Sequence, residues 1–176
     1  MKRYAIIAVA GILAAACGSS SPSSPTTNTP PNSIVFTAAL AAVNEVPPIT
    51  NADLNARGSG TFTLNLTRDG SGTITDATGT FVYSLAAFPA GTIIRATHIH
   101  EAGPAVNGSV VIDTGLTAAS PITLADGTLT NQTFANRTVG ATLANQIIAN
   151  PNGFYFNVHS GLNPGGAVRA QLVRQQ

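Results

Sequence analysis

The chain has 176 residues, enough for one domain with a buried core, and only 9% of them are charged. Its formal net charge is +1. A nucleic-acid-binding protein needs a basic surface to neutralise phosphates, so this balance argues against that class of partner. The single cysteine rules out a disulfide within the chain.

The N-terminus has the features of a targeting segment. Two basic residues precede an apolar run from Tyr4 to Ala16, which is too short to span a bilayer comfortably. Small residues then lead to Cys17, a pattern that resembles a bacterial lipobox although Leu13 lies one position early. One interpretation is a lipoprotein signal peptide over residues 1–16 with a lipid on Cys17; the other is an ordinary secretory signal. We favour the lipoprotein, because the only cysteine lies at the position where a lipobox carries its lipidated cysteine.

Residues 17–33 predict a tether. After Cys17 this segment contains only glycine, serine, proline, threonine and asparagine. Such a composition cannot bury enough apolar area to offset the entropy of ordering, so we expect disorder here and a folded domain over residues 34–176. A lipid, a tether and a domain in this order predict a protein of the bacterial cell envelope, held on a membrane by its lipid in the periplasm or at the cell surface.

The folded region shows alternation of apolar and polar residues, which predicts half-buried antiparallel strands. The clearest case is 58–67, where Phe62, Leu64 and Leu66 share one face. Only 141–149 has helical spacing. Short strands separated by glycine turns predict an all-β fold, an antiparallel Greek-key β-sandwich with at most one short helix. The strands are expected over residues 34–40, 58–67, 73–85, 92–100, 109–114, 121–124, 128–134, 154–159 and 167–173.

All three histidines lie in two of these strands. His98 and His100 are two residues apart, so their side chains leave the same face, roughly 7 Å apart along the strand. His159 ends the strand 154–159 on its polar face, with Tyr155 and Asn157. One interpretation is a metal site in which three imidazoles bind one copper ion, or less favourably one zinc ion. The other is that the histidines hydrogen-bond across neighbouring strands and hold the loops.

Two charged residues near the histidines also have two interpretations each. Glu101 is either an acceptor for an imidazole N–H behind a metal or a capping residue in the turn. Arg169 either guides an anion to the metal or is a structural arginine. The sequence contains no recognisable catalytic triad, phosphate loop or carboxylate pair, so we predict no catalytic residue.

Four ordered blocks resemble the CHRD domain, a module first defined in chordin and common in bacterial secreted proteins. They extend over nearly all of the chain after the tether. The resemblance implies an extracytoplasmic binding domain with no settled enzymatic activity. The blocks are Phe36 with Leu40 and Asn44–Pro48, then His98–Glu101, then Val106–Gly108, and finally Phe154–Ser160 with Asn163–Gly166 and Arg169.

A second resemblance is to Cu,Zn superoxide dismutase. His98–Glu101 is similar to that family's copper-ligand strand, and Val158-His159 to its late copper histidine. Gly165-Gly166 with Arg169 resembles its glycine-rich approach to an arginine, although the spacing differs. No histidine remains for a bridging or zinc ligand. The resemblance implies an immunoglobulin-like or superoxide dismutase-like sandwich with three copper ligands at most.

The sequence therefore supports two hypotheses about function. The first is a lipid-anchored envelope module that binds an unidentified ligand or has a structural role, without being an enzyme. The second is a copper-binding protein with a three-histidine site and superoxide dismutase-like redox chemistry, in which case it is a copper-dependent oxidoreductase. Convergence of His98, His100 and His159 in the fold is the feature that separates them.

Overall fold

The computed structural model describes residues 31–176, so the predicted signal peptide, Cys17 and most of the tether lie outside the described residues. Helices in this part of the chain are α1 (Ala141–Ala149) and two 3-10 turns, η1 (Ala42–Asn44) and η2 (Pro151–Gly153). None of them is long and apolar enough to cross a membrane. The strands are β1 (Ser33–Ala41), β2 (Arg57–Arg68), β3 (Ile74–Ala86), β4 (Thr92–Glu101), β5 (Ser109–Asp113), β6 (Ile122–Leu124), β7 (Leu129–Thr138), β8 (Phe154–Ser160), β9 (Val168–Gln171) and β10 (Val173–Arg174).

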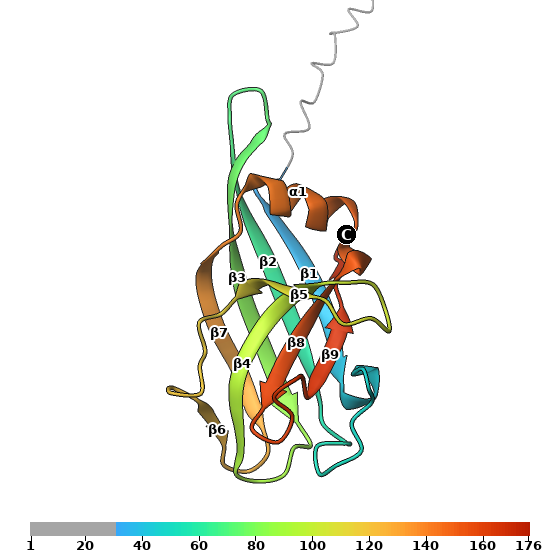
Figure 1. Ribbon diagram of the computed structural model, residues 1–176. Helices are drawn as coiled ribbons and strands as arrows, with labels where there is room; N and C mark the ends of the chain where they lie inside the picture. Colours follow the sequence, from blue (N-terminus) through green and yellow to red (C-terminus); the bar gives the residue numbers. More distant parts are fainter. Residues whose placement is uncertain (1–30) are drawn as a thin grey trace, which may run out of the picture.

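All ten strands belong to one antiparallel sheet. Its order is β5-β4-β8-β9-β1-β2-β3-β7, with β6 paired to β4 and β10 to β1. The sheet curls until β4, β8 and β9 lie in front of β1, β2 and β3 (Figure 1), and β5 comes near β7. The prediction of an all-β fold with one short helix is confirmed. The two layers of the expected sandwich are the front and back halves of this single, nearly closed sheet.

The core between the two layers is built around aromatic rings. Phe62 of β2 and Phe81 of β3 meet edge to face, with ring centroids 5.0 Å apart. Phe156 of β8 meets Phe81 in the same way at 5.4 Å and thereby joins the front layer to the back. The alternation predicted for β2 is confirmed, since Phe62, Leu64 and Leu66 are all buried.

The strand boundaries agree with the predicted ones to within one residue except in two places. β7 continues to Thr138 instead of ending at Phe134. The predicted C-terminal strand is broken at Leu172, whose side chain is buried and whose N–H donates to the carbonyl of Phe154 at 2.9 Å. β9 therefore pairs along its length with β8 and meets β1 at the pair Arg169–Ala41, whereas β10 pairs with β1 alone.

The outer face of the front layer is buried along β8 as well, which the alternating pattern does not predict. On β8 the outward residues Tyr155, Asn157 and His159 are each exposed by 7% or less. The loops that follow β1, β4 and β8 fold over this face and are bonded to one another. Asn107 donates to the Val46 carbonyl at 2.8 Å, which joins the loop after β4 to the loop after β1. This double burial places polar side chains in a shielded environment next to the sheet.

The loops after β1 and β8 are joined by a buried carboxylate. Asp53 is exposed by only 1% and accepts hydrogen bonds from the Ser160 hydroxyl at 2.6 Å and the Asn163 amide at 2.7 Å. The side chains of Asn51 and Asn163 also bond to each other, at 2.7 Å. The loop after β1 is thus fixed to both of the other loops that cover the front layer.

Candidate functional site

The three histidines converge on the covered outer face of the front layer. β4 and β8 pair so that His98 lies opposite Asn157, and His159 follows Asn157 by two residues. The ring centroids of His98 and His159 are 4.8 Å apart, and those of His98 and His100 are 5.4 Å apart. The nitrogen atoms that could serve as ligands lie within 4.8 Å of one another. The predicted side-by-side placement of His98 and His100 and the convergence of all three rings are therefore present in the fold.

Two of the imidazoles have their outer nitrogen held by a backbone carbonyl. His100 Nδ1 lies 3.0 Å from the Gly108 oxygen, and His159 Nδ1 lies 3.0 Å from the Pro164 oxygen. A carbonyl oxygen can only accept, so each Nδ1 carries the proton of a neutral ring. The Nε2 atom of each ring then keeps its lone pair, directed toward the centre of the cluster.

His98 is the third member and lies at the edge of the cluster, with its side chain 14% exposed. Its Nδ1 is 3.1 Å from His159 Nε2, and its Nε2 is 3.5 Å from an oxygen of the exposed Asp113. Burial lowers the pKa of His98 more than the Asp113 charge raises it, which disfavours a doubly protonated ring. Since His159 Nε2 carries a lone pair, His98 Nδ1 donates to it. If His98 bound a metal through Nδ1, its proton would be on Nε2 instead, toward Asp113.

Burial also keeps the other two rings neutral. It lowers the pKa of His100, and it lowers that of His159 to about 4. His100 Nε2 is buried, and no atom of residues 31–176 hydrogen-bonds to it. A buried lone pair without a partner costs free energy, and a neutral imidazole with a free lone pair is the form that binds a metal. Because metal–imidazole bonds are about 2 Å long, two nitrogens on one ion lie at most about 4 Å apart, so the three rings would have to move slightly closer to bind it.

A stack of side chains supports His100. The rings of His100 and Tyr155 are parallel to within 6°, with centroids 4.8 Å apart. The guanidinium of Arg169 lies 4.3 Å from the centroid of the Tyr155 ring. The Tyr155 hydroxyl accepts a hydrogen bond from the Gly108 N–H at 3.2 Å, and the Gly108 carbonyl holds His100. Tyr155 thus fixes the plane of this imidazole both directly and through the backbone.

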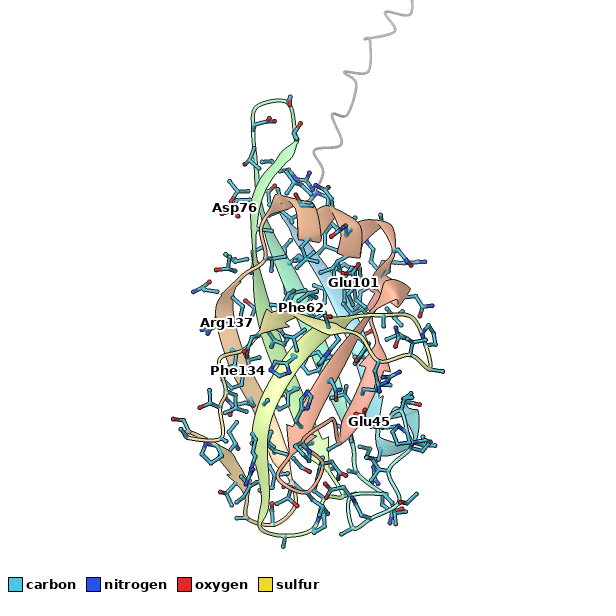
Figure 2. All side chains as sticks on the ribbon, in the orientation of Figure 1. Glu45, Phe62, Asp76, Glu101, Phe134 and Arg137 are labelled. Atoms are coloured by element: carbon cyan, nitrogen blue, oxygen red, sulfur yellow. The ribbon has the colours of Figure 1, made fainter. Side chains whose placement is uncertain are left out.

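The two charged residues predicted beside the histidines lie in different surroundings. Glu101 ends β4, is exposed and lies toward the α1 end of the front layer (Figure 2). Arg169 is exposed by only 2% and donates through Nη1 to the Asn107 side-chain oxygen at 2.9 Å. The carboxylate that lies beside an imidazole nitrogen is that of Asp113. Sequence reasoning misses Asp113, because its place opposite His98 depends on the pairing of β5 with β4.

The CHRD domain family matches the chain over residues 36–172. The protein belongs to the CHRD domain family. This confirms the resemblance drawn from the four sequence blocks, and the matched segment contains all three histidines. No curated protein and no solved structure matches the chain significantly. The likeness to Cu,Zn superoxide dismutase therefore stays a prediction based on the two histidine strands.

The CHRD domain holds a second buried polar group near Arg169. Glu45, in the loop after β1, is 4% exposed and lies toward the end of the front layer opposite Glu101 (Figure 2). Burial raises its pKa to about 7, although the charge of Arg169 opposes the shift. Gly166 makes room for it, since a Cβ there would lie 2.6 Å from Glu45 Oε2. Sequence reasoning places Glu45 in a strand-ending loop and gives no sign of its burial.

Glu45→Gln is expected to change how stability depends on pH. Because the pKa of Glu45 is about 7 in the fold against an ordinary 4.5, folding favours the protonated carboxyl. The free energy by which this carboxyl destabilises the folded state therefore grows as pH rises from 4.5 to about 7. One pKa unit corresponds to about 1.4 kcal/mol, so the variant should gain up to about 3 kcal/mol over the wild type between about pH 4 and pH 8. Urea unfolding at several pH values measures this difference.

The matched control for this prediction is Glu101→Gln, which makes the same chemical change at an exposed position. Its effect on the free energy of unfolding is expected to be within about 0.5 kcal/mol, as for most surface substitutions. A stability difference between Glu45→Gln and the wild type that does not grow from pH 4 to pH 8 would show that the buried carboxyl has no raised pKa.

Proposed function

We propose that this CHRD domain is a metal-binding module whose ligand is a copper ion held by His98, His100 and His159. The observation that supports this is the convergence of one nitrogen from each of the three rings to within 4.8 Å, with the other nitrogen of each ring beside an oxygen. Metal-binding histidines typically have their second nitrogen fixed in this way. Imidazole ligands suit copper and zinc, and divalent copper forms the tighter complexes.

The surroundings of the cluster fit a site with one open side. His98 is the exposed member, and Asp113 beside it has a side chain that is 58% exposed. His100 and His159 are buried under the loops, so a metal would enter past His98. Three protein ligands leave a position for water or a small ligand. Bound copper would supply one-electron redox chemistry there, while the chain itself provides neutral ligands, a carboxylate at the entrance and a shielded wall.

The test of this proposal is copper binding by the wild-type protein, purified without an affinity tag that binds metal. After loading and dialysis, elemental analysis is expected to give one copper per chain. Electron paramagnetic resonance of the loaded protein is expected to show hyperfine coupling to nitrogen. Loss of all copper on dialysis would leave the other candidate, a binding or structural module that uses no metal.

We also propose that the protein is a lipoprotein of the bacterial cell envelope. The support comes from the sequence: a short apolar segment, small residues before a single cysteine, and a hydrophobe-free stretch up to Ser33. A domain on such a tether can bind a ligand near a membrane without inserting into it.

Cys17→Ser is expected to release the protein from membranes. A serine cannot carry the thioether-linked lipid, so the variant should move from the detergent phase to the aqueous phase in detergent partitioning. Membrane fractionation followed by immunoblotting measures this change, with Ser19→Ala as the control for an alteration in the same segment. A variant that remains with the membranes would overturn the lipoprotein proposal.

A further inference from the structure

A cavity of about 530 Å³ lies over β9, between the loop after β1 and the loop after β4. No histidine lines it, so it is separate from the candidate metal site. Most of its wall consists of valine, proline and alanine side chains, and the charged groups in the wall are Glu45 and Arg169. A mostly apolar cavity of this size with a few placed polar groups is typical of a small-molecule site.

Arg169 is held in the wall of the cavity, and most of its N–H donors make no hydrogen bond to residues 31–176. It is 2% exposed, and the central carbon of its guanidinium lies over the ring of Tyr155. Its side chain makes one hydrogen bond to residues 31–176, from Nη1 to Asn107, whereas a guanidinium has five N–H donors. The ion pair found in this part of the chain joins His98 to Asp113 and does not involve Arg169. A buried, oriented guanidinium without a carboxylate partner is well suited to bind one from a ligand.

Glu45 lines the same cavity and lacks a donor. Its Oε1 atom is buried, and no donor within residues 31–176 hydrogen-bonds to it. An unpaired buried carboxylate oxygen costs free energy, and a small rotation of the side chain toward a donor in the cavity would recover it. Glu45 and Arg169 carry opposite charges, yet no ion pair within 4.0 Å joins them. The wall thus offers one acceptor and one set of donors to the same occupant.

We propose that this cavity binds a small zwitterion with an aliphatic side chain, such as a free branched-chain amino acid. Its carboxylate pairs with Arg169, its ammonium group pairs with Glu45, and its side chain lies against the apolar wall. A simple anion would be repelled by Glu45, and a simple amine by Arg169, so a ligand with both charges satisfies the wall best. The proposal does not depend on copper, because none of the three histidines takes part.

Calorimetric titration of the wild-type protein with L-leucine, N-acetyl-leucine and leucinamide tests this without any mutation. We expect saturable binding of leucine at about pH 8 and at least about tenfold weaker binding of each analogue, since each lacks one of the two charges. Absence of saturable leucine binding at up to about 10 mM, or equal binding of all three compounds, would overturn the proposal.

Glu45→Gln then assigns the ammonium contact. In this variant the preference for leucine over N-acetyl-leucine is expected to disappear, whereas the preference for leucine over leucinamide should remain, because Arg169 is intact. Glu101→Gln, outside the cavity, should bind all three compounds like the wild type. An unchanged preference in Glu45→Gln would refute the assignment. Copper content measured in parallel is expected to stay the same, which separates this site from the metal site.

Discussion

Replacing His98, His100 or His159 by alanine is expected to weaken copper binding by more than about 100-fold in each case. Loss of a partner behind a ligand already costs about 10–100-fold in affinity, and loss of the ligand itself costs more. The remaining two imidazoles cannot complete the shell, because no other histidine or cysteine exists in residues 31–176. Competition with a chelator of known affinity measures the dissociation constant. Asn65→Ala, at an exposed position on β2, is the control for an alanine substitution elsewhere in the sheet.

A second prediction for copper binding concerns Asp113, the carboxylate beside His98. Asp113→Asn should weaken copper binding by about 10–100-fold, because an amide is a poorer acceptor for the His98 N–H than a carboxylate. Glu101→Gln makes the same change at the carboxylate predicted from sequence, and we expect it to leave the affinity unchanged. Equal effects of the two substitutions would contradict the role given to Asp113. Wild-type affinity in any of the histidine variants would exclude the three-histidine site.

Phe156→Ala is expected to lower the free energy of unfolding by about 3–5 kcal/mol, the range for removing a fully buried phenylalanine ring. The ring is 0% exposed and meets Phe81 and Tyr83 with centroids 5.4 and 5.8 Å away. It also covers Gly60, where a Cβ would lie 3.1 Å from its atoms. Backbone hydrogen bonds hold β8 and β2 in place, so the space left by the ring cannot close. Urea unfolding followed by circular dichroism measures the loss.

Phe134→Ala is the matched control for the core prediction. Phe134 is only half-buried on β7, and its ring stacks on Tyr83 at a centroid distance of 6.3 Å. The surroundings of a partly exposed ring can relax into the space, so its removal should cost less than half as much. If the two variants lost the same free energy, Phe156 would not be the link between the two layers of the core.

Sequence reasoning predicts those parts of the fold that depend on local pattern. The alternation around Phe62 predicts β2, and the spacing of Leu143, Ile147 and Ile148 predicts α1. The shared face of His98 and His100 follows from the two-residue period of a strand. Each of these features depends on residues that are close together in the chain, so it can be predicted from the local sequence pattern.

The other features of the site depend on register and on loop placement, which local pattern does not specify. The expected convergence of His159 with His98 requires β8 to pair with β4 in one particular register. Gly108 and Pro164 contribute backbone carbonyls to the site, and every residue has such a carbonyl, so residue type gives no signal. The outer face of β8 has the pattern of an exposed face. It is buried because the covering loops hydrogen-bond both to one another and to the strand beneath.

The hydrogen bonds among the covering loops should affect how fast their backbone amide hydrogens exchange with solvent deuterium. The carbonyls that anchor His100 and His159 belong to two different loops, and both loops are fastened to the one after β1. Segments joined in this way open together as one cooperative unit, below the free energy of global unfolding. The amides of Gly108 and Asn163, far apart in the chain, should then exchange with solvent deuterium at coupled rates. The release of an ion from the two buried imidazoles would be set by the rate of that common opening.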